Sequence, residues 1–287
     1  MTTGMRCLAL LVAVTGCGDD LGPYVPPPPD GPQASLRFRH GEDQAAGEFG
    51  VYVPIAGTEA NVGAGDFTIE MWLRSDGRLE TDSWGGCRGG AAQGPAWLDG
   101  HVLLDRSESN MPNYFGLSFF GDAAAFGVGD DTFTEAGVCE QAYVDDGEWH
   151  HVAAVRDGGA IRVYIDGISH VSVGGMDGSD VSYPGESADR ASLGGYLIIG
   201  GRKNAGDFEP WRGWIDELRI STVARYPALP APTAPFEPDA ATAILYHFDE
   251  DAGDEVIDAS ADMLDGAIVD ELTGEFSIEL DPSSPFL

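Results

Sequence analysis

The sequence predicts an all-β protein, built as a two-sheet antiparallel β-sandwich. Three observations predict this fold class. Short runs of alternating apolar and polar residues recur from Ser35 onward, as expected for strands that are buried on one face. The turn dipeptide Asp-Gly occurs eight times. No segment before Pro230 shows a helical period, and turns about every ten residues are typical of sandwiches and barrels.

The N-terminus precedes the predicted sandwich. Residues 1–16 are interpreted as a signal peptide, because their apolar run from Leu8 to Thr15 is too short to span a bilayer. The four residues that end at Cys17, Val-Thr-Gly-Cys, resemble a bacterial lipobox, which implies cleavage before Cys17 and lipid on its thiol. Residues 17–34 then form a lipidated, proline-rich linker with an extended backbone. We therefore expect an exported protein, held by lipid to the outer membrane or cell surface of a bacterial envelope.

Eight runs carry the strand pattern from Ser35 onward. They cover residues 35–40, 67–74, 101–106, 114–120, 149–156, 161–167, 196–201 and 214–221. The run 67–74 has an apolar face that is expected to line the core: Phe67, Ile69, Met71 and Leu73. Its other face is mixed: Thr68, Glu70, Trp72 and Arg74. Such a strand fits a sheet that is buried on one side.

A glycine-rich stretch at 83–100 contains Trp84 and Trp97, which flank Cys87. Tryptophan faces stack on sugar rings, so both rings are candidate ligand contacts, and Trp72 is a third. The alternative, that the rings cover the edge of the core, stays open. Without the signal peptide and the lipidated cysteine, Cys87 and Cys139 form an even pair in an exported protein, and we expect a disulfide between them.

Residues 145–167, "DDGEWHHVAAVRDGGAIRVYIDG", predict a hairpin with its turn at 157–159. The adjacent residues His150 and His151 fall on opposite faces of a strand. They cannot both bind one ion without a bulge, and no third histidine is near in the sequence. The segment is therefore interpreted as a hairpin and not as a metal site.

Residues 214–221, "WIDELRIS", predict another strand. Strict alternation places Asp216 on the same face as Leu218 and Ile220. An acid on an apolar face needs a partner, and three remain open: a backbone donor, an arginine or a structural Ca²⁺. Asp249 and Asp258, in acidic segments near the C-terminus, are the other candidate Ca²⁺ ligands. Neither acidic segment has the full residue spacing of an EF-hand calcium loop. The first interpretation is therefore that both aspartates accept hydrogen bonds from backbone amides in turns.

The net charge of the chain is −33, from 48 acidic and 15 basic residues. Binding to nucleic acid requires a basic face, so nucleic acid is not an expected partner. A strongly acidic surface favours solubility and attracts cations.

Four segments in order, 65–74, 145–167, 197–201 and 214–226, resemble bacterial laminin-G-like, concanavalin A-like lectin/glucanase domains. Residues 236–269 resemble an element that these domains often carry beside their core. The resemblance implies one jelly-roll domain over 35–287, including a C-terminal element at 236–287. It also implies ligand binding at a concave face and at rim loops.

We therefore expect a membrane-anchored binding or adhesion module that recognises a glycan or another surface polymer. A glycoside hydrolase on the same fold is an alternative, and it requires two facing carboxyl groups. Residues 80–82 and 279–281 begin the Glu-x-Asp pattern of related glucanases but lack its final glutamate. No catalytic residue is assigned, and no enzymatic activity is expected. A structural envelope protein that binds other proteins is the second alternative.

Overall fold

The computed structural model describes most of the 287-residue chain. The described residues are 33–39, 48–79, 97, 100–108, 111–121, 123–132, 134–141, 143–171, 178–189, 194–201, 209–226, 231–250, 252–271 and 277–286. Within these ranges the backbone forms strands and turns and no α-helix. It follows that no helix in the described part is able to cross a membrane.

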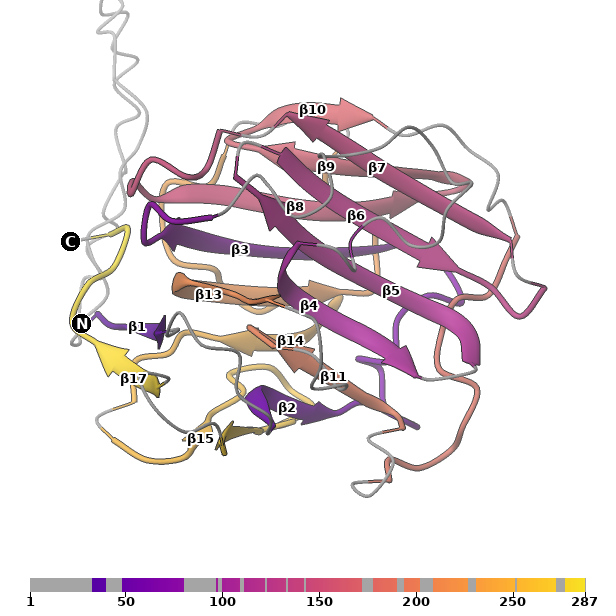
Figure 1. Ribbon diagram of the computed structural model, residues 1–287. Coiled ribbons are helices and arrows are strands. Elements are labelled where there is room, and N and C mark those ends of the chain that lie inside the picture. The colour runs from indigo at the N-terminus through magenta and orange to yellow at the C-terminus, as the bar shows by residue number, and fades with distance from the viewer. Residues whose placement is uncertain are drawn as a thin grey trace, which may run out of the picture.

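The strands form two stacked sheets, shown as two layers in Figure 1. The order in the first sheet is β10 (Ile168–Val171), β9 (Ala160–Ile165), β8 (His150–Asp157), β3 (Phe67–Ser75), β13 (Gly213–Ser221), β1 (Ser35–Arg39) and β17 (Ser277–Asp281). A further strand, β14 (Thr242–Tyr246), pairs with β13. All of these pairings are antiparallel.

The order in the second sheet is β15 (Glu255–Val256), β16 (Gly266–Asp270), β2 (Phe49–Pro54), β11 (Tyr196–Ile199), β4 (His101–Glu108), β5 (Met111–Phe120), β6 (Ala123–Gly129) and β7 (Glu135–Gln141). The short strand β12 (Glu209–Pro210) pairs with β4 and is parallel to it. The predicted all-β, two-sheet antiparallel sandwich is therefore confirmed, with β12 as a parallel addition.

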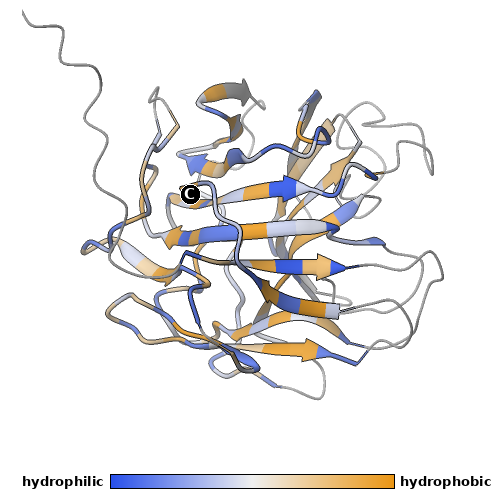
Figure 2. Ribbon diagram, turned by 90° about the vertical axis from the view of Figure 1, so that its left-hand side faces the viewer, coloured by the Kyte–Doolittle hydropathy of each residue, from blue (hydrophilic) through white to orange (hydrophobic). Residues whose placement is uncertain are grey.

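The hydrophobic core lies between the sheets and follows the period-two pattern of the strands. Figure 2 shows hydrophilic and hydrophobic residues alternating along them. The predicted apolar stripe of β3 lies in this core: Phe67, Ile69, Met71 and Leu73. The predicted hairpin at 145–167 is also confirmed, as β8 and β9, and Val152 and Val163 point into the core. Each fully buried aliphatic side chain of this kind contributes about 1.5–3 kcal/mol.

The outer face of the first sheet is partly covered as well. Ala153 and Val155 of β8 pack there against Tyr164 and Tyr226. The chain that follows β13 supplies Tyr226, so a segment folded back over the sheet shields these residues from solvent. Towards β1, the outer face carries charged residues next to tryptophan rings.

The strict alternation predicted for 214–221 is wrong after Asp216. Pairing between β13 and β3 shifts between Asp216 and Arg219, which marks a β-bulge, and Glu217 has a φ of 51°. The bulge inserts one residue, so Ile215 shares the core face with Leu218 and Ile220. Asp216 itself lies opposite Trp72, on the outer side of the sheet.

Candidate functional site: an arginine-lined pocket

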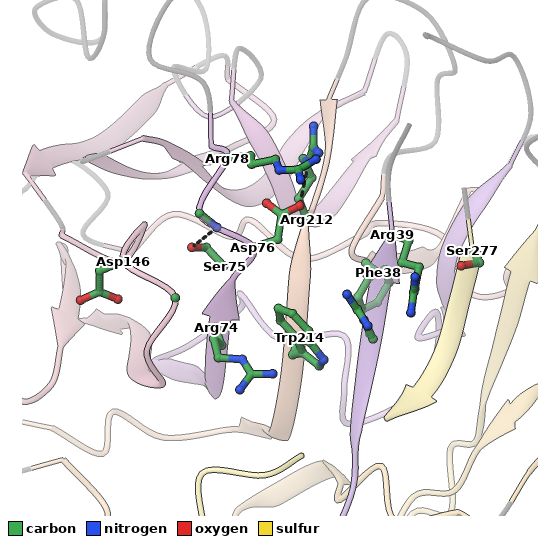
Figure 3. A pocket seen from close by; sticks show the side chains of 13 residues that line it. Phe38, Arg39, Arg74, Ser75, Asp76, Arg78, Asp146, Arg212, Trp214 and Ser277 are labelled. Carbon is green, nitrogen blue, oxygen red and sulfur yellow. Dashed lines mark hydrogen bonds and ion pairs between the residues drawn. The ribbon is translucent and has the colours of Figure 1, made fainter. Parts of the chain in front are cut away.

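A pocket of about 890 Å³ opens where β1 and β3 end and β13 and β17 begin. The residues that line it are drawn in Figure 3. The lining residues are Arg37, Phe38, Arg39, Arg74, Ser75, Asp76, Gly77, Arg78, Asp146, Gly147, Arg212, Trp214 and Ser277. Five of them are arginines and two are aspartates.

A row of three side chains crosses the floor of this pocket. Trp214 of β13 lies opposite Arg37 of β1 and opposite Arg74 of β3. Residues that oppose one another in antiparallel strands share a face, so all three side chains project from the outer face of the sheet. The guanidinium carbons of Arg37 and Arg74 lie 4.4 Å and 3.9 Å from the centroid of the Trp214 ring. These cation–π contacts hold both guanidinium groups in place.

A second group of side chains lies where β3 ends, and Figure 3 shows Asp76, Arg78 and Arg212 together. Arg212, just before β13, is largely buried and donates from Nε to Asp76 Oδ2 at 3.3 Å. The turn after β3 is closed by a hydrogen bond from the Gly77 amide to the Ser75 hydroxyl, 3.1 Å long. Gly77 has a φ of 72°, which glycine adopts without strain. Arg78 is exposed at this turn.

The described carboxylates near the pocket form salt bridges with some of these arginines but not with others. Arg37 lies 3.8 Å from Glu279 and 3.6 Å from Asp281, and Arg39 lies 2.6 Å from Glu279. In the part of the chain that the structure describes, neither Arg74 nor Arg78 forms a salt bridge. Two of the five positive charges therefore remain available to a ligand.

Arg74 is held by neutral groups. It donates from Nη2 to the hydroxyl of Ser283 at 3.2 Å, and its guanidinium carbon lies 5.1 Å from the Trp149 ring centroid. Its Nε is buried, with no acceptor among the residues that the structure describes. Burial lowers the pKa of Arg74 below the ordinary value, and repulsion from Arg37 lowers it further, although Asp281 opposes the shift. The group is still a cation at neutral pH, because arginine side chains stay protonated in proteins.

A histidine close to the pocket carries its own pair of acids. His150 Nδ1 lies 2.8 Å from Asp166 Oδ2, and its Nε2 lies 3.0 Å from Asp146 Oδ1. The hydrogen bond to Asp166 is the main cause that raises the pKa of His150 to about 9. The hydrogen bond from His150 in turn lowers the pKa of Asp146. The Asp146 charge is therefore already neutralised where it meets the pocket.

The three predicted ligand-binding tryptophans do not form this site. Trp84 lies outside the described residues. Trp97 is 1% exposed and packs against Val102 and Tyr114, so its predicted role as a sugar platform is wrong in this structure. The open alternative, a ring that covers a sheet, describes Trp97 better.

Trp72 lies on the outer face, as expected, but does not line the pocket. Its ring centroid is 5.5 Å from that of Phe286 and 5.7 Å from that of His151. These neighbours cover part of the ring. Trp214 takes the central position in the pocket instead.

The candidate calcium ligands are separate hydrogen-bonding centres. Asp216 is buried and accepts the Glu217 amide at 2.8 Å through Oδ1. Burial, with the nearby Glu217 charge, raises its pKa to about 9. Of the partners expected for Asp216, the structure therefore provides a backbone donor.

The other two aspartates cap backbone. Asp249 Oδ1 accepts the Ala34 amide at 2.8 Å, and Asp258 Oδ1 accepts the Leu245 amide at 2.9 Å. Among the residues that the structure describes, no group of three or more acids, histidines or cysteines has a metal-binding arrangement. Calcium binding stays a prediction.

Two predicted sites involve cysteines. Cys139 lies on β7. Cys87 and the lipidation site Cys17 lie outside the described residues, so the Cys87–Cys139 pairing and the lipid anchor stay predictions.

Sequence reasoning did not find the arginine pocket. One local signal was present: Arg37 and Arg39 are two residues apart and therefore share a strand face. The scarcity of basic residues, 15 in the chain, makes such a pair informative. The contributions of Arg74 and Arg212 become visible only when the register of β1, β13 and β3 is known.

Comparisons with known proteins bear on the fold. A sequence model described as the concanavalin A-like lectin/glucanases superfamily matches residues 47–228. No curated protein sequence matches the chain.

Among solved structures, a candidate carbohydrate-binding protein from Bacteroides ovatus has a TM-score of 0.51 and 17% identity, over 87% of this chain. The match spans 60% of that protein's length. An SAP-like pentraxin from Limulus polyphemus has a TM-score of 0.43 and 14% identity, over 68% of this chain and 78% of its own. The CBM40 of the Ruminococcus gnavus IT-sialidase has a TM-score of 0.43 and 13% identity, over 67% of this chain and 94% of its own.

At such identities, likeness in structure concerns the fold alone. The match to the superfamily model is a match in sequence. It covers more than half of the chain and includes β2 to β13. The two-sheet topology agrees with it. The chain belongs to the concanavalin A-like lectin/glucanases superfamily.

Proposed function

We propose that this chain is an extracytoplasmic binding module that recognises a glycan or another surface polymer in the arginine-lined pocket. The observation that carries the proposal is the pocket itself, which presents several fixed hydrogen-bond donors around an open volume. Membership of a lectin-containing superfamily agrees with it, although fold alone does not establish function.

The chemistry of the pocket suits a ligand with many oxygen atoms. An arginine presents five N–H donors in a planar fork and no acceptor. Arg37 and Arg74 stack on Trp214, so their planes are oriented and less side-chain entropy is lost when a ligand binds. Sugar hydroxyl, carboxylate and sulfate oxygens are suitable acceptors.

The proposed location is supported by the N-terminal sequence. We propose that the lipid on Cys17 and the linker to residue 34 attach the sandwich to the cell envelope. β1 starts at Ser35, next to this linker, and its other end at Arg39 lines the pocket. Because β1 runs from the linker towards the pocket, the ligand would bind at the end of β1 that is farther from the lipid anchor. Substitution of Cys17→Ser should move the protein from the membrane fraction to the soluble fraction, and an unchanged distribution would contradict the anchor.

A glycan array tests the proposed function. The purified full chain should retain a subset of immobilised glycans. The double variant Arg74→Gln/Arg78→Gln should lose them, whereas Arg162→Gln should retain them. Arg162 is a matched control because it is a partly exposed arginine on β9 of the same sheet and does not line the pocket. An array on which the wild-type chain retains no glycan would reject the proposal.

The glycoside hydrolase alternative requires a carboxyl group that keeps its proton at working pH. In the described lining of the pocket, the two carboxyl groups have cationic partners instead. Asp76 accepts from Arg212, and Asp146 has a lowered pKa beside His150. Release of reducing ends from a retained polysaccharide would support a hydrolase in spite of this.

The second alternative is a structural envelope protein. A blank array together with one stable protein partner would favour it.

A further inference from the structure

The distribution of positive charge in this chain is uneven. Of its 15 basic residues one, Lys203, is a lysine, which leaves 14 arginines. Five of these 14 line one pocket, although the net charge of the chain is −33. In such an acidic protein, arginines are expected to be distributed among the acids that they neutralise. A pocket with five arginines and two aspartates departs from this expectation.

The pairing of these arginines shows where charge is left over. Glu279 and Asp281 neutralise the Arg37 and Arg39 side of the pocket, and Asp76 neutralises Arg212. The acids that act on Arg74 at longer range are Asp281 and Glu148, and Arg37 repels it. Arg78 has no partner among the described residues. The excess positive charge therefore lies on the β3 side of the pocket, at Arg74 and Arg78.

The row Arg37–Trp214–Arg74 brings two like charges to one indole ring. Charges of the same sign at such a separation repel. Glu279 and Asp281 lie within 4 Å of Arg37, whereas the acids that act on Arg74 do so from farther away. An anion beside Arg74 would relieve this repulsion. Guanidinium groups match the planar oxygens of carboxylate and the tetrahedral oxygens of sulfate through paired N–H···O bonds.

A polyanion that spreads over the surface does not fit the remainder of the molecule. The net charge of −33 would repel it wherever it left the pocket. A single acidic group inside the pocket avoids most of this repulsion, because charges beyond about 8 Å are largely screened at physiological salt. The ligand that these observations favour is a chain of mostly neutral sugars with a local acid.

We infer that the pocket selects glycans that carry a carboxylate or sulfate group, and that Arg74 and Arg78 bind this acidic group. The inference rests on the proposed function and names the ligand class for the same pocket.

The test compares acidic glycans with their neutralised forms. A neutral oligosaccharide with a single uronic acid and the methyl ester of that oligosaccharide differ in the carboxylate charge, and a galactan oligosaccharide with a single sulfate and its desulfated form differ in the sulfate. These four probes join the array, and affinities for every retained glycan are measured by calorimetry. An acidic form should bind at least about tenfold more tightly than its neutral counterpart, because hydrogen bonds between two charged groups are stronger than those to a neutral oxygen. Comparison within the ester pair and within the desulfation pair shows whether the pocket prefers a carboxylate or a sulfate group.

The variants test the assigned arginines. Arg74→Gln/Arg78→Gln should reduce the affinity for the acidic glycan to that for its neutral form, and Arg162→Gln should leave it unchanged. If the double variant does not fold, as judged by circular dichroism, Arg78→Gln alone should lower the affinity at least threefold, because Arg78 is exposed at a turn and is not needed for packing.

The two possible failures are distinguishable. Retained glycans that are neutral, or that bind equally well after neutralisation, would overturn the selectivity for acids and leave glycan binding intact. A wild-type chain that binds no glycan in either form would overturn both proposals. Binding to an acidic peptide but to no acidic glycan would also overturn the inference.

Discussion

Glu70 shows how single residues stabilise the outer face of the first sheet. Its carboxylate is fully buried on β3 and accepts hydrogen bonds from His151, Arg219 and Tyr226. Burial alone would raise the pKa of Glu70, but the hydrogen bond to His151 and the charge of Arg219 hold it below its usual value. A buried charge with this many partners is tolerated, whereas removal of one partner would leave an uncompensated charge.

His150 should make stability depend on pH above neutrality. Its pKa is about 9 in the folded chain, against about 6.5 when unfolded, so its charged form favours the fold. This contribution is fully present below about pH 6.5 and is lost as the pH rises through 9. Urea unfolding of wild type and His150→Gln from pH 6 to pH 10 should therefore give curves that converge at high pH. A constant gap over that range would contradict this assignment.

Asp216 should also make the fold less stable as the pH rises, but over a wider range that begins at acidic pH. Its pKa is about 9 in the fold, against about 3.9 when unfolded, so the folded chain binds more protons between these values. Stability from the neutral carboxyl group is therefore lost as the pH rises from about 4 to 9. Asp216→Asn, which is neutral at every pH, should gain stability relative to wild type across this window. Asp254→Asn, at an exposed position, is the control and should show no such trend.

At the scale of elements, glycines in two neighbouring strands make room for a tryptophan. Gly116 of β5 and Gly127 of β6 lie opposite each other, and the ring of Trp97 lies over both. A Cβ atom on Gly116 would lie 2.3 Å from the ring, and one on Gly127 would lie 2.9 Å away. The outer face of the second sheet is therefore shaped to bury Trp97.

Gly116→Ala should destabilise the chain by about 1–3 kcal/mol, the usual cost of overpacking a tight site. Neither the ring nor the strand is able to move away cheaply, since Trp97 also packs on Val102 and Tyr114. Gly137→Ala on β7 is the matched control, because its new Cβ would lie 3.6 Å from the nearest atom, the carbonyl oxygen of Phe126. Urea unfolding measures both, and equal losses in the two variants would contradict the role of Trp97.

At the scale of the whole molecule, strands from the C-terminal part of the chain complete both sheets. β14 and β17, from the C-terminal part of the chain, join the first sheet, and β15 and β16 join the second. A disulfide and a bound calcium ion, both predicted from the sequence, would further stabilise the folded chain.

The predicted disulfide is one such cross-link. Peptide mass spectrometry without reductant should show Cys87 joined to Cys139, and reduction should lower the melting temperature. A loop of this length contributes about 4 kcal/mol in the chain-entropy model. Alkylation of both thiols in the unreduced protein would exclude the bond.

Calcium is the other predicted cross-link. If an acidic segment binds it, a titration should raise the melting temperature, since a ligand at 100 times its Kd stabilises by about 2.7 kcal/mol. Magnesium at the same concentration controls for ionic strength. An unchanged melting temperature at millimolar calcium would remove Asp216, Asp249 and Asp258 as ligands.

The sequence by itself determined the fold class. Alternation in β3, β8 and β9 is a property of successive residues, so it predicts which side chains enter the core before any pairing is known. The same local reasoning correctly separated His150 from His151.

The tertiary structure alone decided the rest. One extra residue at the β13 bulge moved Asp216 away from the face of Leu218, and a backbone φ at Glu217 is not visible in a hydropathy pattern. The burial of Trp97 depends on glycines of two other strands. The pocket joins Arg37, Arg74, Arg78 and Arg212 because β1, β3 and β13 are neighbours in space, and strand order is set by long-range packing that no short stretch of sequence records.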